Sequence, residues 1–250
     1  MSLENKIAIV TGGSRDIGRA VSEAIAAQGA KVVVNYFNNA AEGEATVAAI
    51  QQADGEAIAV KGDMTKQGDV ENLVAEARKA FGDTIDILVN VVGGLVARKP
   101  LAEMDEEFFE YVMKLNVTST FLTMKAVVPH MGDGGSIVNF SSQAGRDGGG
   151  PGASAYAAAK GAIMTFTRGM AKELGPSNIR VNCVCPGMIS TTFHDTFTKD
   201  QVRANVAAAT PLRREGQAKE VADLAVYLAS PASSFITGAG VDINGGMCFS

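Results

Sequence analysis

Apolar residues form short uninterrupted runs that alternate with longer segments of helical spacing along the whole chain. The runs occupy residues 7–10, 32–35, 57–60, 85–90, 136–140, 179–184 and 240–243. The helical segments between them include residues 40–52, 68–80, 106–129 and 155–174. Strands that alternate with helices predict right-handed crossovers and a parallel sheet with helices on both faces. Most runs lack polar alternation, as expected for strands that are covered on both sides.

No proline- or serine-rich linker interrupts this alternation, so the pattern predicts a single α/β domain over residues 1–250. We expect a doubly wound sheet of about seven parallel strands. Ligands of such sheets bind beyond the carboxyl ends of the strands. The loops expected there, at about 93–101, 145–153 and 188–213, are predicted to bind the substrate.

The composition and charge of the chain argue against several classes of binding partner. The chain has 46% hydrophobic residues, a net charge of -5 and no basic tract, which argues against nucleic acid and anionic membranes. It has no signal-peptide pattern and no apolar run of about 18 residues, so we expect neither export nor a membrane span. The three cysteines and two histidines are too few and too scattered to predict a metal site. An odd, small number of cysteines is typical of proteins in the reducing cytoplasm.

A glycine-rich segment, TGGSRDIG, joins the first predicted strand to a helical segment at residues 11–18. Glycines between a strand and a helix let backbone N–H groups approach the phosphates of a dinucleotide. Many ordinary strand-to-helix turns also need a glycine, so the segment alone leaves both interpretations open.

The end of the second predicted strand bears on cofactor choice. A site for NAD places Asp or Glu there, about 20 residues after the glycines, to bind the ribose 2′-hydroxyl. Residues 34–39 read VNYFNN and contain no carboxylate, while Arg15 lies in the glycine loop itself. A guanidinium there can pair with a 2′-phosphate. The segment therefore favours NADP over NAD, unless Arg15 is only a solvated loop residue.

Tyr156 and Lys160 are four residues apart on a predicted helix of small residues, so they share one face. A phenol with a pKa of about 10 is a poor acid or base at neutral pH. A lysine ammonium at about 4 Å favours the phenolate by about 4 kcal/mol at an effective dielectric constant near 20. Ser142 ends the fifth strand, and Asn116 lies inside a helical segment where it either marks a kink or binds water.

Together these motifs resemble the short-chain dehydrogenase/reductase family over essentially the whole chain. The resemblance implies a Rossmann-type fold, a nicotinamide cofactor and a catalytic set of Asn116, Ser142, Tyr156 and Lys160. It also implies that Asp63 caps the adenine, and that the terminal VDINGG segment belongs to the family pattern. The implied cofactor-binding residues are Gly12, Ser14, Arg15, Asp16, Ile17, Gly18, Tyr36, Asp63, Met64, Asn90, Gly93, Tyr156, Lys160, Pro186, Gly187, Ile189 and Thr191.

The resemblance further implies hydride transfer between the nicotinamide and a carbonyl carbon. In reduction, Tyr156 would donate a proton to the developing alkoxide and Ser142 would hydrogen-bond the same oxygen. Lys160 would lower the pKa of Tyr156 and hold the ribose, and Asn116 would anchor a water relay.

Two positions depart from the family pattern. Asp16 replaces the middle glycine of the phosphate loop, and Asn90-Val91-Val92-Gly93 replaces the usual Asn-Asn-Ala-Gly. Both departures bear on cofactor affinity. We predict that the Asp16 carboxylate points away from the pyrophosphate and pairs with a neighbouring cation such as Arg15 or Arg19.

The substrate is predicted from fewer residues. The nearest resemblance is to 3-oxoacyl-carrier-protein reductases, but residues 130–136 and 173–179 lack the lysines and arginines that would meet an acidic carrier. Arg98, Arg146 and His194 are the candidate substrate residues, because two arginines can hold a carboxylate. They resemble those of bacterial keto-deoxy-uronate reductases.

We therefore favour a small polar carbonyl substrate, a sugar or uronate-derived ketone, over an acyl thioester. NADP(H) is the favoured cofactor, NAD(H) is a possible one, and the family resemblance implies a homotetramer. A non-catalytic dinucleotide-binding protein is the remote alternative, supported by Asp16 and opposed by the intact catalytic set.

Overall fold

Seven parallel strands form one sheet in the computed structural model, which describes residues 1–249. The sheet order is β3-β2-β1-β4-β5-β6-β9. The strands are β1 (Ile7–Thr11), β2 (Lys31–Tyr36), β3 (Ala57–Lys61), β4 (Ile85–Asn90), β5 (Met131–Phe140), β6 (Arg180–Pro186) and β9 (Gly240–Ile243). The direction of winding reverses between β1 and β4, so a crevice opens there beyond the strands' carboxyl ends.

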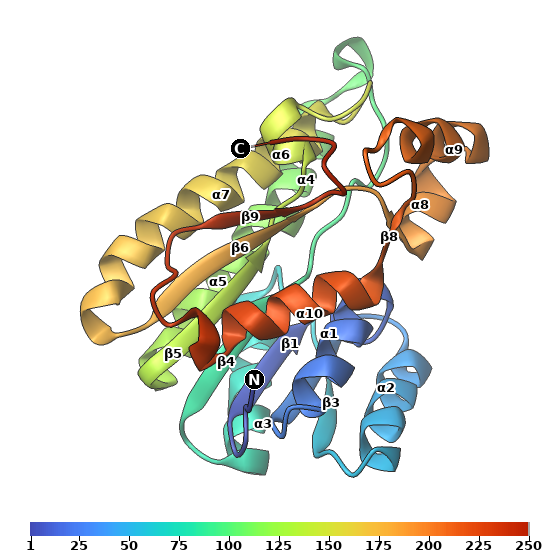
Figure 1. The fold of residues 1–250 in the computed structure, drawn as a ribbon. Coiled ribbons are helices and arrows are strands. Elements are labelled where there is room, and N and C mark those ends of the chain that lie inside the picture. Colours follow the sequence, from blue (N-terminus) through green and yellow to red (C-terminus); the bar gives the residue numbers. More distant parts are fainter. Residues whose placement is uncertain (250) are drawn as a thin grey trace.

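Helices cover both faces of the sheet (Figure 1). The helices are α1 (Asp16–Ala26), α2 (Ala40–Gln52), α3 (Gln67–Phe81), α4 (Glu106–Met113), α5 (Ser119–Val127), α6 (Ala144–Asp147), α7 (Ser154–Leu174), α8 (Thr192–Phe197), α9 (Asp200–Ala209) and α10 (Ala218–Ala229). One core lies between the sheet and α1, α2 and α10, and a second lies between the sheet and α3, α5 and α7.

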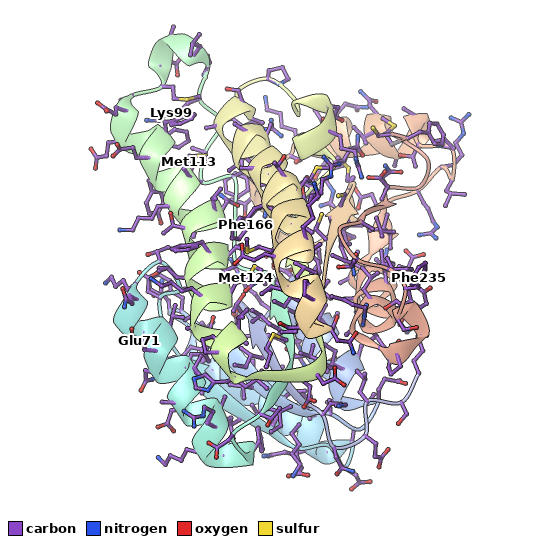
Figure 2. All side chains as sticks on the ribbon, turned by 90° about the vertical axis from the view of Figure 1, so that its left-hand side faces the viewer. Glu71, Lys99, Met113, Met124, Phe166 and Phe235 are labelled. Atoms are coloured by element: carbon purple, nitrogen blue, oxygen red, sulfur yellow. The ribbon has the colours of Figure 1, made fainter. Side chains whose placement is uncertain are left out.

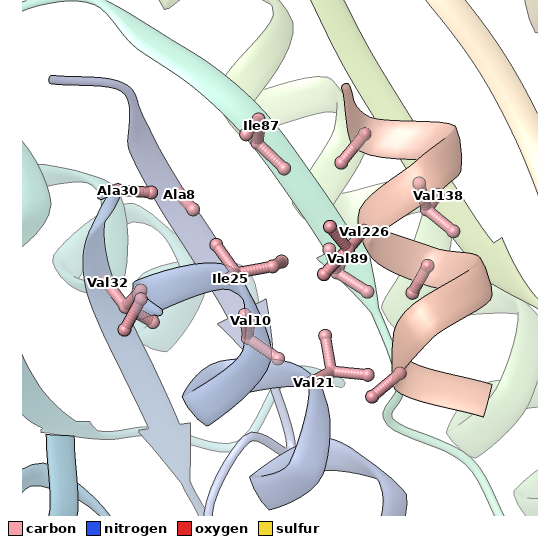
Figure 3. Packing of buried hydrophobic residues seen from close by; sticks show 14 of the residues in the cluster. Ala8, Val10, Val21, Ile25, Ala30, Val32, Ile87, Val89, Val138 and Val226 are labelled. Carbon is pink, nitrogen blue, oxygen red and sulfur yellow. The ribbon is translucent and has the colours of Figure 1, made fainter. Parts of the chain in front are cut away.

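Successive residues of a strand enter opposite cores. Val10 of β1 lies in the core that α1 and α10 cover, whereas its neighbour Ile9 lies in the other core. Figure 3 shows Val21 and Ile25 of α1, with Val226 of α10, above the first of these strand faces. Every residue of β1 and of β6 is buried, which explains the unbroken apolar runs. The predicted doubly wound α/β fold is confirmed.

Two segments differ from the predicted elements. The helical segment predicted over 106–129 is interrupted by a π-helical turn, Lys114–Thr118. The tract at 190–199, predicted to be irregular, contains the short helix α8. Residues 188–213, which we call the lid, also include β7 (Ile189–Ser190) and α9, and β7 pairs with β8 (Gly216–Gln217).

Candidate active site

The glycine loop runs from β1 into α1 and is closed tightly on itself. A Cβ on Gly18 would lie 2.0 Å from the carbonyl oxygen of Gly12, and Gly12 has a φ of +62°. Only glycine fits at both positions, because the first contact is steric and the second conformation is left-handed. The backbone at the start of α1 can therefore approach a phosphate closely, so the loop fits the pyrophosphate of a dinucleotide.

Asn35, which sequence reasoning missed, braces this loop. Its buried Oδ1 accepts a hydrogen bond from Gly12 N at 3.0 Å, and its Nδ2 donates to Gly62 O at 3.1 Å. The side chain thus connects the ends of β1, β2 and β3. A polar residue in an otherwise apolar strand run was the available signal.

The adenosine side of the crevice lacks a carboxylate at the end of β2. The Tyr36 ring packs so closely on α2 that a Cβ on Gly43 would lie 2.7 Å from it. Arg15 is exposed, and no acidic side chain within residues 1–249 pairs with it. Asp63 accepts hydrogen bonds from Thr65 N and Oγ1 at 2.9 and 2.7 Å, so its carboxylate stabilises its own turn.

Other predicted cofactor residues are fixed inside the fold. Ser14 and Met64 are buried, and Ile17 packs against the first core. The buried Asn90 side chain accepts from Thr123 Oγ1 at 2.7 Å and donates to Asn139 at 2.9 Å. Such residues can reach a cofactor only through neighbouring backbone atoms.

The Val91-Val92 departure is accommodated by backbone hydrogen bonds. Thr11 Oγ1 accepts from Val91 N at 3.1 Å and from Val92 N at 3.4 Å. The two valine side chains pack against the first and second cores, respectively. The loop after β4 is therefore held against the glycine loop without the polar residue that the family pattern has there.

Tyr156 and Lys160 lie on α7, where the helix passes the end of β5. Lys160 is 4% exposed, its Nζ donates to Phe140 O at 2.8 Å, and it lies 5.7 Å from the centroid of the Tyr156 ring. Burial lowers the pKa of Lys160 to about 8. Burial also raises the pKa of Tyr156, and a hydrogen bond with Ser142 opposes this only in part.

The expected lowering of the Tyr156 pKa by Lys160 is therefore not what the structure shows. Loss of hydration is the dominant cause, and the Lys160 ammonium donates its hydrogen bond to a backbone carbonyl, Phe140 O. The phenol keeps its proton at neutral pH. In this protonated state Tyr156 can act as a proton donor.

Asn116 occupies the π-helical turn between α4 and α5 and is fully buried. Its Oδ1 accepts from Gly94 N at 3.0 Å, and its Nδ2 donates to Gly94 O at 3.0 Å and Val112 O at 2.9 Å. A Cβ on Gly93 would lie 2.5 Å from Asn116 Oδ1 and 2.8 Å from Lys160 Nζ. Gly93 thus lets the loop after β4 lie against both side chains, and Asn116 lies in a π-helical turn that interrupts the helix.

Ser142 follows β5, and its Oγ accepts from Ala144 N at 3.1 Å at the start of α6. This turn directs the hydroxyl towards Tyr156, with which it shares the hydrogen bond described above. The structure thus gathers Asn116, Ser142, Tyr156 and Lys160 around one end of β5.

The segment after β6 brings the nicotinamide-side residues to the same crevice. Pro186 ends β6, and Gly187 N donates to Ile243 O at 3.0 Å. Ile189 is buried in β7, and Thr191 Oγ1 donates to Ile189 O at 3.1 Å just before α8.

Phe193 of α8, which sequence reasoning did not single out, lies next to the catalytic tyrosine. Its ring centroid is 6.2 Å from that of Tyr156 and 5.2 Å from that of Phe197. His194 packs edge-on against Phe193 at 5.0 Å, and burial lowers its pKa. The lid therefore presents an aromatic surface beside Tyr156.

The two candidate substrate arginines bind separate partners. Arg98 donates to Pro151 O at 3.1 Å and to Phe197 O at 3.3 Å. Arg146 forms an ion pair with Asp242 at 2.6 Å and donates to Gly240 O at 2.8 Å. The structure does not bring the two guanidinium groups together as a carboxylate clamp, because each one joins neighbouring segments of the protein.

Asp16 also differs from expectation, because its carboxylate binds neither Arg15 nor Arg19. It accepts hydrogen bonds from Thr192 N at 3.0 Å and Thr192 Oγ1 at 2.5 Å, in the first turn of α8. Arg19 instead pairs with Glu23 at 2.7 Å along α1. Thr192 comes 176 positions after Asp16, so local sequence gave no signal of this contact.

Residues 1–249 contain no group of three or more His, Cys, Asp or Glu side chains placed to hold a metal ion. None of the helices in this range combines the length and apolar character needed to cross a membrane.

Comparison with known proteins decides the family. The family model described as enoyl-(acyl carrier protein) reductase matches residues 12–248. The chain belongs to the short-chain dehydrogenase/reductase family.

Three relatives of this family illustrate the range of likeness. The chain is 39% identical over 249 residues to a 3-oxoacyl-[acyl-carrier-protein] reductase of Synechocystis sp., covering 98% of each protein. A short-chain dehydrogenase/reductase of Serratia marcescens superposes with a TM-score of 0.93 at 33% identity, covering 99% of each chain. A blue fluorescent protein from a metagenomic library, solved in complex with NADPH, has a TM-score of 0.92 at 32% identity over 100% of both chains.

The chain is accordingly a nicotinamide-dependent oxidoreductase of this family, and the glycine loop, Gly93 and the Tyr156–Lys160 pair fit such a cofactor.

Proposed function

We propose that this protein is an NADP(H)-dependent reductase of a small soluble ketone or aldehyde. The observation that carries this proposal is the arrangement of Asn116, Ser142, Tyr156 and Lys160 around the end of β5. A protonated phenol at neutral pH is suited to reduction, in which the substrate oxygen must receive a proton.

The cofactor supplies the hydride, and the chain's own residues bind and protonate the substrate oxygen. Ser142 Oγ and Tyr156 OH both hydrogen-bond this oxygen, which stabilises the negative charge that develops on it. Tyr156 then donates its proton. Lys160 stabilises the resulting phenolate and holds the ribose hydroxyls, and Asn116 fixes the backbone of Gly94 beside them.

Preference for NADP(H) over NAD(H) is part of the proposal. It is supported by the exposed Arg15 side chain in the phosphate loop and by the absence of a carboxylate in residues 34–39. A negative side chain there would repel the 2′-phosphate of NADP(H), whereas a guanidinium would attract it.

The substrate flank is aromatic on the lid side, where Phe193 faces Tyr156. A sugar or uronate-derived ketone remains our favoured class, but a uronate carboxylate would have to displace Phe197 O or Pro151 O from Arg98. Reduction of a 3-oxoacyl thioester is the second candidate, because a 39% identical relative carries that name.

Exposed aromatic side chains support a homotetramer. Phe109, Tyr111 and Phe121 on α4 and α5 are 40 to 50% exposed, and these helices lie beside α7 in Figure 2. Phe235, which Figure 2 also labels, and Phe249 are exposed near the C-terminus. We place the protein in the cytoplasm, where the thiols of Cys183 and Cys185 stay reduced.

A spectrophotometric screen tests the function. Oxidation of NADPH and NADH is followed with uronate ketones, sugars, simple diketones and acetoacetyl thioesters. We expect turnover with NADPH and a small ketone. Activity with the thioester alone would refute the substrate preference, strict use of NADH would refute the role of Arg15, and NADPH binding without any turnover would refute the reductase itself.

A further inference from the structure

We propose that Asp16 is a positioning residue that latches the lid to the phosphate loop. The carboxylate stands where the family pattern has a glycine, and it accepts both hydrogen-bond donors that Thr192 offers, N at 3.0 Å and Oγ1 at 2.5 Å. Two segments far apart in sequence are thereby joined across the mouth of the crevice.

The first turn of α8 depends on this contact because it lacks a cap of its own. The residue before α8 is Thr191, whose side chain forms no cap hydrogen bond and bonds back to Ile189 O instead. The N–H groups at the start of a helix have no partner within the helix. Asp16 supplies the acceptor that an N-cap residue of the same segment usually supplies.

The latch fixes the aromatic surface beside Tyr156. Phe193 follows Thr192 directly, and its ring contacts Tyr156. At the other end of α8, Phe197 O accepts from Arg98. Helix α8 is thus held at both ends, with Phe193 between the two contacts.

Little buried surface stabilises this part of the lid. Neither α8 nor α9 contains a fully buried residue. Segments with little buried apolar surface open more readily than the core, so individual polar contacts weigh heavily in their opening equilibrium. Loss of the Asp16–Thr192 contact should therefore open the lid without unfolding the sheet.

The consequence for the cofactor rests on the proposed function. A pyrophosphate bound at the start of α1 would lie beside Asp16, so the lid that closes over the site is tied to the loop that binds the cofactor. Cofactor release then requires this contact to break, and Asp16 slows release instead of repelling the phosphates.

Hydrogen–deuterium exchange of the cofactor-free, full-length protein tests the latch directly. Asp16→Gly removes both carboxylate acceptors and tolerates the left-handed φ of +50° at this position. Thr192→Val removes the hydroxyl donor alone. We expect exchange across 193–198 to rise about tenfold in Asp16→Gly and about threefold in Thr192→Val.

The double variant and a control make the result specific. Asp16→Gly combined with Thr192→Val should exchange no faster than Asp16→Gly alone, because both changes break one contact. Arg19→Gln breaks the neighbouring Arg19–Glu23 pair on α1 and should leave lid exchange unchanged. Wild-type exchange rates in Asp16→Gly, or equal acceleration by Arg19→Gln, would overturn the latch.

Release of NADPH, measured by stopped-flow fluorescence, tests the second step. We expect at least threefold faster release from Asp16→Gly and from Thr192→Val. Slower release from Asp16→Gly would show that the carboxylate repels the phosphates and would overturn the role in release. Failure of the wild type to bind NADPH would refute the proposed function, while the exchange experiment would still decide whether the latch exists.

Discussion

The wall and the lid of the crevice are held in different ways. The wall, formed by Asn116, Ser142, Tyr156 and Lys160, is anchored mainly to backbone groups, such as Gly94 and Phe140 O. The lid, residues 188–213, is held by side-chain pairs such as Asp16–Thr192 and Arg203–Glu215. Backbone anchors of buried groups are costly to break, whereas partly exposed side-chain pairs contribute little each. We therefore expect the wall to perform the proposed chemistry and the lid to adjust binding.

The largest expected effect follows from removing the proton donor. Tyr156→Phe should lower kcat for ketone reduction by about 10³-fold, since a positioned general acid contributes about 10²–10⁴-fold. The ring remains to contact Phe193. Steady-state kinetics and an NADPH fluorescence titration measure the two properties separately. A variant with more than about one tenth of wild-type kcat would place the acid elsewhere.

Lys160 should combine loss of activity with a gain in stability. A fall in its pKa from 10.5 to about 8 corresponds to a burial penalty of about 3 kcal/mol on the charged lysine. Lys160→Met removes this penalty and one hydrogen bond to Phe140 O, which is worth about 1 kcal/mol. We therefore expect the inactive variant to be about 2 kcal/mol more stable at pH 7 in urea unfolding.

The pH dependence of the stability gained by Lys160→Met tests whether the burial penalty on Lys160 causes it. The folded pKa lies below the unfolded one, so the unfolded chain binds more protons between pH 8 and 10.5 and the wild type gains stability as pH rises through this window. The advantage of Lys160→Met should shrink over the same range. A gain that is constant with pH, or a less stable variant, would contradict the burial penalty.

The pH profile of kcat/KM should also show the ionisation of Lys160. Because Lys160 loses its proton near pH 8, stabilisation of the Tyr156 phenolate weakens above that pH. We expect kcat/KM for reduction to be level from about pH 6 to 7.5 and to fall about tenfold for each pH unit well above 8. Ser142→Ala should lower the whole profile without moving its inflection, whereas an inflection outside about pH 7 to 9 would argue against Lys160.

The smallest effect is expected in the lid. Arg203 bridges Asp195 and Glu215, and the latter ion pair measures 2.7 Å. Arg203→Gln should raise the substrate KM about two- to fivefold and leave kcat within a factor of two, because partly exposed ion pairs contribute about 1 kcal/mol or less. Lys219→Gln removes an exposed pair on α10 and serves as the control, with no expected change. A large fall in kcat would show that the lid takes part in the chemistry.

The wall was predictable from sequence because its geometry is local. Tyr156 and Lys160 share a helix face through their spacing, and Ser142 follows a strand whose apolar run is unmistakable. The sheet was predictable for a similar reason, since central strands such as β1 and β6 are buried along their whole length.

The lid was not predictable, because long-range contacts determine it. Asp16 contacts Thr192 across the crevice, Arg98 contacts Phe197 O, and Phe193 contacts Tyr156. No spacing rule connects such partners. The pKa of Tyr156 was misjudged for a related reason, since burial of both side chains depends on the packing of the whole crevice.

Transfer of deuterium from labelled cofactor tests the central claim most directly. NADPH with deuterium in place of both hydrogens at nicotinamide carbon 4 is incubated with the wild type and the best ketone of the screen, and the alcohol is analysed by mass spectrometry. The account predicts one deuterium on the carbon that bears the new hydroxyl group, and no labelled product with Tyr156→Phe on the same timescale. Oxidation of the cofactor without a deuterated alcohol would contradict it.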